Sequence, residues 1–137
     1  MTGGRRSAFF VAGLLLAALA HAHHNPAMLY DLGQEITVSG VVTEFNMGNP
    51  HIRIYFDVDN DGTTEQWLAE GGSRTVLLRK GWTGSEFMPG DEVTVRGHPT
   101  RDGSNVVHME YVILPDGTEM YAEDIDRSAL ENLPRRR

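Results

Sequence analysis

Cysteine is absent from this 137-residue chain, and basic residues are scarce. Without Cys there is no disulfide, no thiolate zinc site, no thiol redox centre and no lipid anchor attached through Cys. The 12 Lys and Arg against 19 Asp and Glu give a formal charge of −7, which disfavours a nucleic-acid backbone or an anionic membrane surface as partner. The length suits one domain, since domains commonly hold about 100–150 residues. What the chain does have is His, with six in so short a sequence.

A long apolar run occurs near the start of the chain. Arg5 and Arg6 precede an apolar stretch over residues 8–20, and small residues stand at Ala20 and Ala22. This order is typical of an export signal, cleaved here after Ala20 or Ala22. The alternative is an uncleaved membrane anchor, which is disfavoured because the run falls short of the ~20 residues that cross a bilayer. We expect residues 1–22 to be a signal peptide and the protein to be periplasmic, with no membrane span after cleavage.

The rest of the chain is rich in strand patterns and turn residues. Residues 51–58 alternate apolar and polar side chains, which is typical of a strand with one buried face. In residues 34–46 the apolar side changes near Gly40, which suggests a bulge that lets one strand serve two sheets. Ser73 is a suitable N-cap for a short helix that ends before Gly81. Further strands are expected at residues 64–69, 92–98 and 105–114.

Three strands, a short helix and two strands thus follow one another. This order favours an all-β fold, namely a small five-stranded OB-like barrel with one short helix between strands 3 and 4. The alternative is a small β-sandwich, in which the helix has no obvious place. We expect the barrel domain over residues 23–121 and a C-terminal tail over residues 122–137 that is partly helical or disordered.

The predicted mature N-terminus is rich in imidazoles. Cleavage after Ala22 starts the chain at His23 and His24, where the terminal amine and the ring of His23 can chelate one ion. Cleavage after Ala20 instead makes His23 third from the amine, a spacing suited to square-planar Cu(II) or Ni(II). Nitrogen-rich tetragonal sites select these ions. Copper is therefore the cofactor to test, against the simpler interpretation that the His residues of a frayed end bind nothing.

Two more His and one acid extend this hypothesis into the barrel. Ligands of OB barrels typically meet the loops that join strands 1–2 and 4–5. Here His51 ends the first loop, His98 begins the second, and Glu70 follows the third strand. His108 lies further along, on the last strand. We predict a copper or other divalent metal site that uses His23, His24, His51, His98 and Glu70.

An acidic run over residues 57–62 is similar to the start of a calcium-binding loop. Such loops need a bidentate Glu at their twelfth position, where this sequence has Leu68. The flanking residues also show strand patterns rather than helical ones. We therefore expect an acidic hairpin tip here rather than a calcium site.

The sequence shows no arrangement of nucleophile and base typical of an enzyme. Ser73, Ser85 and Ser104 lack the Gly-rich turn of a nucleophile elbow. Glu70 and Asp91 are conceivable acid–base groups, but acids near turns are usually only solvated. OB barrels bind single-stranded nucleic acid through basic grooves, which the acidic charge disfavours here. The sequence therefore favours a binding protein over an enzyme.

Taken in order, the motifs resemble an uncharacterised family of small exported bacterial proteins, domain of unknown function 6152. The matching pieces are His23-His24, residues 40–45, Asn49-Pro50-His51, Trp67-Leu68-Ala69-Glu70, Gly81-Trp82, Pro89-Gly90-Asp91 and Arg101-Asp102-Gly103-Ser104. The resemblance implies a periplasmic OB-like barrel and carries no known activity. The positions that it matches to family motifs include His23, His24, His51, Trp67 and Glu70.

Three functions fit these observations. The first is a non-enzymatic periplasmic binding or accessory module that holds copper or another divalent ion. The second is a protein- or glycan-interaction domain of the cell envelope, which uses the outward face of Arg53 and Tyr55. The third is a mononuclear copper oxidase with an N-terminal histidine brace. The expected partner is a metal ion or a periplasmic protein, and not a nucleic acid.

Overall fold

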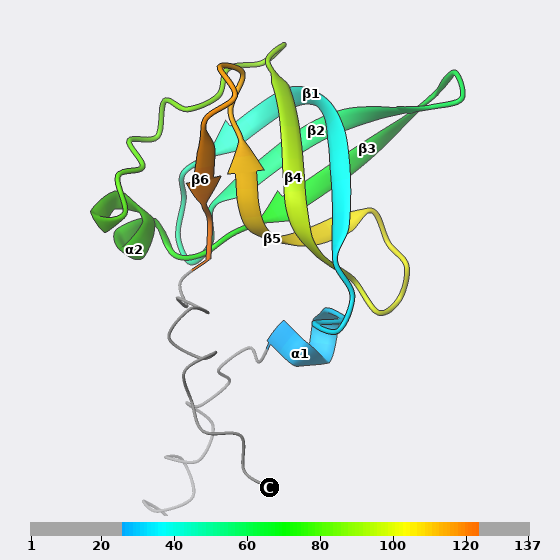
Figure 1. Cartoon of the computed structure of the whole chain (residues 1–137), viewed down its shortest axis with the longest axis horizontal. Helices are drawn as coiled ribbons and strands as arrows, with labels where there is room; N and C mark the ends of the chain where they lie inside the picture. The colour runs from blue at the N-terminus through cyan, green and yellow to red at the C-terminus, as the bar shows by residue number, and fades with distance from the viewer. Residues whose placement is uncertain (1–25, 124–137) are drawn as a thin grey trace, which may run out of the picture.

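A computed structural model of the chain describes residues 26–123 (Figure 1). The predicted signal peptide, both His23 and His24, and the tail beyond Glu123 lie outside the described residues. Within residues 26–123, no helix is both long and apolar enough to cross a membrane.

Six strands and two short helices form the described part of the chain. The strands are β1 (Ile36–Asn46), β2 (Arg53–Asn60), β3 (Thr63–Glu70), β4 (Glu92–Pro99), β5 (Val106–Ile113) and β6 (Glu119–Tyr121); the helices are α1 (Pro26–Leu29) and α2 (Arg74–Arg79). The five predicted strands and the helix between strands 3 and 4 are confirmed. The sequence does not predict α1 and β6, because elements of four and three residues are too short to show a period.

The strands form one sheet that closes on itself. Their order is β3-β2-β1-β4-β5-β6, and a further pairing joins β3 to β5. That closing contact is parallel and runs from Leu68 beside Val106 to Glu70 beside His108. β6 extends the sheet beyond β5 without taking part in the closure. The fold is thus the predicted five-stranded barrel, and the sandwich alternative is wrong.

β1 bends so that its two halves pair with different strands. Its first half, up to Val41, pairs with β4, and its second half, from Val41, pairs with β2. The register with β2 shifts between Val42 and Glu44, which marks a bulge. The apolar side of β1 therefore changes as predicted, at a bulge that lies just after Gly40. Gly40 itself allows a close crossing, since a Cβ there would overlap the carbonyl oxygen of Asp57.

Inward-facing side chains of the strands fill the barrel. The largest fully buried ones include Phe56, Ile52, Ile54 and Met109, and each such side chain contributes roughly 1.5–3 kcal/mol when it leaves water. α2 closes one end of this core with the buried Leu77. The helix begins as predicted, because the Ser73 hydroxyl accepts a hydrogen bond from the Val76 N–H at 3.4 Å.

The hairpin between β2 and β3 projects from the barrel (Figure 1). Its turn is made by Asp61 and Gly62, whose φ angles are 51° and 85°. Positive φ at both central residues is the turn type that matches the twist of a two-residue hairpin. The Asp59 carboxylate accepts a hydrogen bond from the Gly62 N–H at 2.7 Å. The predicted acidic hairpin tip is confirmed.

Candidate functional site

A half-enclosed cavity of about 240 Å³ lies where α1 meets one end of the barrel. We call it the N-terminal pocket, because Pro26, the first described residue, forms part of its wall. The remaining lining residues are Leu29, Tyr30, Pro50, His51, Arg53, Glu70, Gly71 and His108. Proline, leucine and tyrosine give the pocket apolar walls, and a few convergent polar groups make it a suitable place for a small ligand.

Three neighbouring strands contribute polar side chains to this pocket in one row. Arg53 of β2 stands opposite Glu70 of β3, and Glu70 stands beside His108 of β5. All three alternate with buried residues of their strands, so they point out of the barrel core. The closing contact between β3 and β5 therefore brings Glu70 and His108 together, although they lie far apart in the sequence.

Glu70 is held by two donors. Arg53 Nε donates to its Oε1 and the Tyr30 hydroxyl donates to its Oε2, both at 2.9 Å. Burial alone would raise the pKa of the Glu70 carboxyl, but these two hydrogen bonds and the charge of Arg53 outweigh burial and lower the pKa below its usual value. Burial, with the neighbouring Glu70, raises the pKa of the Tyr30 phenol far above its usual value. The acid is thus ionised and the phenol neutral near pH 7.

His51 is oriented by the backbone. It follows Pro50, whose peptide bond with Asn49 is cis. Its Nδ1 lies 3.1 Å from the carbonyl oxygen of Gly71. A carbonyl only accepts hydrogen bonds, so Nδ1 carries the proton, and in the neutral ring Nε2 keeps its lone pair. This is the arrangement of a metal-binding His, in which one ring nitrogen donates to a carbonyl while the other remains available.

His98 is placed differently from its prediction, since it does not line the N-terminal pocket. The residue is only 3% exposed, and its Nδ1 lies 2.6 Å from the carbonyl oxygen of Gln34. Its Nε2 has no hydrogen-bond partner in the described part of the chain and lies 3.7 Å from Oε2 of Glu110. The structure therefore brings His51 and Glu70 to one pocket and leaves His98 apart from it.

His108, which the predicted metal set leaves out, lines the N-terminal pocket. Its ring stacks on Tyr30 with centroids 5.0 Å apart, and its Nε2 lies 3.2 Å from Oε1 of Glu123. The sequence places His108 on the last strand. Its position beside Glu70 could not be predicted, because the parallel contact between β3 and β5 has no signature in the local sequence.

No group of three or more His, Asp or Glu side chains within residues 26–123 is arranged to hold a metal ion. His51 and Glu70 come from the predicted metal set, whereas His23 and His24 lie outside the described residues. Asp57 and Asp59 lie on β2 and Asp61 lies in the turn after it, so these acids belong to a β-hairpin rather than to a calcium-binding loop. Within residues 26–123 the pocket therefore does not by itself supply a complete set of metal ligands.

Comparison with known proteins gives a family but no activity. No curated protein matches the chain. A model of a family of unknown function, DUF6152, matches residues 12–108, which include every residue that lines the N-terminal pocket. Because this match covers well over half of the chain, the protein belongs to the DUF6152 family.

Proposed function

We propose that the protein is an exported, periplasmic accessory module without enzymatic activity, which binds copper or another divalent ion at the N-terminal pocket. The ligands are the mature N-terminal amine, the rings of His23 and His24, and Nε2 of His51. His108 forms part of the pocket wall. In this proposal Glu70 positions Arg53 and Tyr30 rather than binding the metal, because both of its oxygens already accept hydrogen bonds.

One observation carries the proposal: Pro26 lines the same pocket as a His51 ring whose Nε2 is left with a lone pair. His24 lies two residues before Pro26, and two residues of extended chain reach about 7 Å. Its ring is therefore within reach of the pocket. An amine and two or three imidazoles form the nitrogen-rich set that favours Cu(II). The absence of Cys leaves nitrogen and oxygen as the main ligand atoms.

Titration calorimetry with Cu(II) on the mature chain that begins at His23 tests the proposal. We expect micromolar or tighter binding, and an affinity at least about tenfold weaker in His51→Ala or when one Gly precedes His23. His98→Gln is the matched control, since that ring lies outside the pocket, and circular dichroism establishes that each variant is folded. Failure of the correctly processed protein to bind copper would overturn the proposal.

A further inference from the structure

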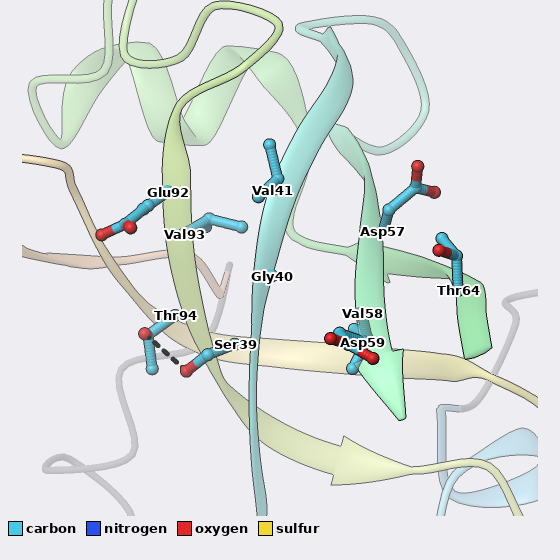
Figure 2. Close-up of a pocket in the computed structure, with 10 residues that line it drawn as sticks. All are labelled: Ser39, Gly40, Val41, Asp57, Val58, Asp59, Thr64, Glu92, Val93 and Thr94. Carbon is cyan, nitrogen blue, oxygen red and sulfur yellow. Dashed lines mark hydrogen bonds between the residues drawn. The ribbon is translucent and has the colours of Figure 1, made fainter. Parts of the chain in front are cut away.

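A second and larger hollow lies along the bent strand β1. It has a volume of about 720 Å³, and we call it the acidic groove. Its lining residues are Ser39, Gly40, Val41, Asp57, Val58, Asp59, Thr64, Glu92, Val93 and Thr94. Figure 2 shows these residues on β4, β1, β2 and β3, with β1 running through the middle. None of the N-terminal pocket residues takes part, so the groove is a separate feature.

The groove opens where β1 and β2 separate. The ladder between them runs from Asn46 opposite Arg53 to Val41 opposite Asp57, and it ends there. Beyond this rung, β1 continues to Ile36 beside β4, and β2 continues to Asn60 beside β3. In the same register Gly40 would next face Val58, and Ser39 would face Asp59. These residues line the groove instead.

This separation leaves a strand edge without a partner. The Val42 N–H donates to the Asp91 carbonyl, and the Val42 carbonyl accepts from Gly90, so Val42 directs its backbone groups toward β4. In an antiparallel ladder successive residues alternate between the two sides, so Ser39 directs its N–H and carbonyl toward β2. Within residues 26–123 no strand pairs with that side of β1 before Val41. An edge of this kind is suited to adding an extended chain.

The charges around this edge are of one sign. Figure 2 shows Val41 between Glu92 on β4 and Asp57 on β2, with Asp59 below them. The lining holds no Lys, Arg or His. In the part of the chain that the structure describes, no hydrogen bond or ion pair engages the carboxylates of Asp57 and Glu92. Val41 is 45% exposed between them, which gives the groove an apolar centre.

We propose that the acidic groove binds an extended segment of a partner protein in which Lys or Arg alternates with apolar residues. The segment pairs through its backbone with the free edge of β1 next to Ser39. Its cationic side chains meet Asp57, Asp59 and Glu92, and an apolar side chain covers Val41. Main-chain hydrogen bonds supply affinity in this mode, whereas the charges select the partner. This proposal does not depend on metal binding at the N-terminal pocket.

A labelled six-residue peptide that alternates Lys and Val is a direct probe, followed by fluorescence anisotropy at low salt. We expect the double variant Asp57→Asn/Glu92→Gln to bind the peptide about tenfold more weakly than the unaltered chain. The matched control Glu44→Gln/Glu119→Gln removes the same charge from exposed positions outside the groove and should change the affinity less than about twofold. Equal losses of peptide affinity in the two double variants would show that net charge alone causes the loss, and would overturn the proposal.

Two further measurements test strand pairing and the identity of the occupant. A peptide with N-methyl groups on alternate backbone nitrogens cannot continue a ladder, and we expect it to lose most of its affinity; equal binding would overturn the proposal. Amide exchange at Ser39 should slow when the unmodified peptide binds. The triple variant R135Q/R136Q/R137Q should bind the peptide as the unaltered chain does. A clear gain in affinity would show that the chain's own Arg run fills the groove, and would overturn the assignment to a partner.

Discussion

The N-terminal pocket and the acidic groove differ in whether their carboxylates have partners in the described part of the chain. In the pocket, Glu70 accepts hydrogen bonds on both oxygens from residues of the same chain. In the groove, Asp57 and Glu92 have no such partner within residues 26–123. Paired charges hold side chains in fixed positions, whereas unpaired charges on a surface remain available to a binding partner. The difference indicates that the pocket is built to position its donors and the groove to attract a chain.

The largest expected effect concerns the glycine that each region contains. Gly40→Ala should lower the free energy of unfolding by about 3 kcal/mol, because the new Cβ meets the rigid backbone of β2. Gly71→Ala should cost less, about 2 kcal/mol, since its new Cβ would lie 2.8 Å from the Ala122 carbonyl oxygen and the end of Met109, whereas at Gly40 the Asp57 carbonyl oxygen would lie closer still. Urea unfolding of both variants measures the difference.

The control for these glycines is Gly62→Asn at the hairpin turn. Nothing lies within 4 Å of a Cβ at Gly62, and Asn tolerates the positive φ of 85°. We expect a change below about 0.5 kcal/mol. If Gly71→Ala proved more costly than Gly40→Ala, the close crossing of β1 and β2 would not be the tighter of the two sites.

The next effect comes from removing one acid from each region. Glu70→Gln should lower the free energy of unfolding by about 1 kcal/mol, because it weakens two hydrogen bonds that solvent partly screens. Glu92→Gln should change it by less than about 0.5 kcal/mol. Thermal or urea unfolding at pH 7 measures both values. Equal losses would remove the distinction between paired and unpaired carboxylates.

The pH dependence of stability should reflect the same distinction. The hydrogen bonds of Glu70 lower its pKa in the folded protein below the ordinary value of 4.5. The stability that they provide is therefore fully present above about pH 4.5 and is lost as the pH falls through the folded pKa. Urea unfolding between pH 7 and pH 3 should show a steeper acid loss for the unaltered chain than for Glu70→Gln. Parallel curves would contradict this role of Glu70.

The smallest effect is expected at the free edge of β1. The Ser39 hydroxyl shares a hydrogen bond of 2.8 Å with the Thr94 hydroxyl on the exposed outer face. Ser39→Ala should lower the free energy of unfolding by less than about 0.5 kcal/mol and leave peptide binding nearly unchanged, because the edge uses backbone groups. A large loss of peptide affinity in this variant would assign recognition to the hydroxyl instead.

Local patterns in the sequence predicted most of the barrel. The alternation of β2, the Ser73 cap of α2 and the turn at Asp61 and Gly62 each depend on residues close together in the chain, and the structure contains all three. The parallel contact of β3 with β5 depends on residues nearly forty positions apart, so no local pattern predicts it.

Contacts between distant residues also limited the prediction of the candidate site. His51 and Glu70 were predicted and share a pocket, but His108 was given less weight and His98 more than its position supports. Both His98 and His108 point outward from adjacent positions of β4 and β5. Of the two, His108 lines the N-terminal pocket, where Tyr30 stacks on its ring, and no local pattern in the sequence predicts that contact.

The closing contact of the barrel also links binding to folding. Glu70 and His108 adjoin only when β3 and β5 are paired, so the complete N-terminal pocket exists only in the closed barrel. By thermodynamic linkage, any ligand that binds the closed form alone raises the free energy of opening by RT ln(1 + [L]/Kd). An ion bound between the N-terminal chain and His51 would therefore stabilise the closed barrel against opening of the contact between β3 and β5.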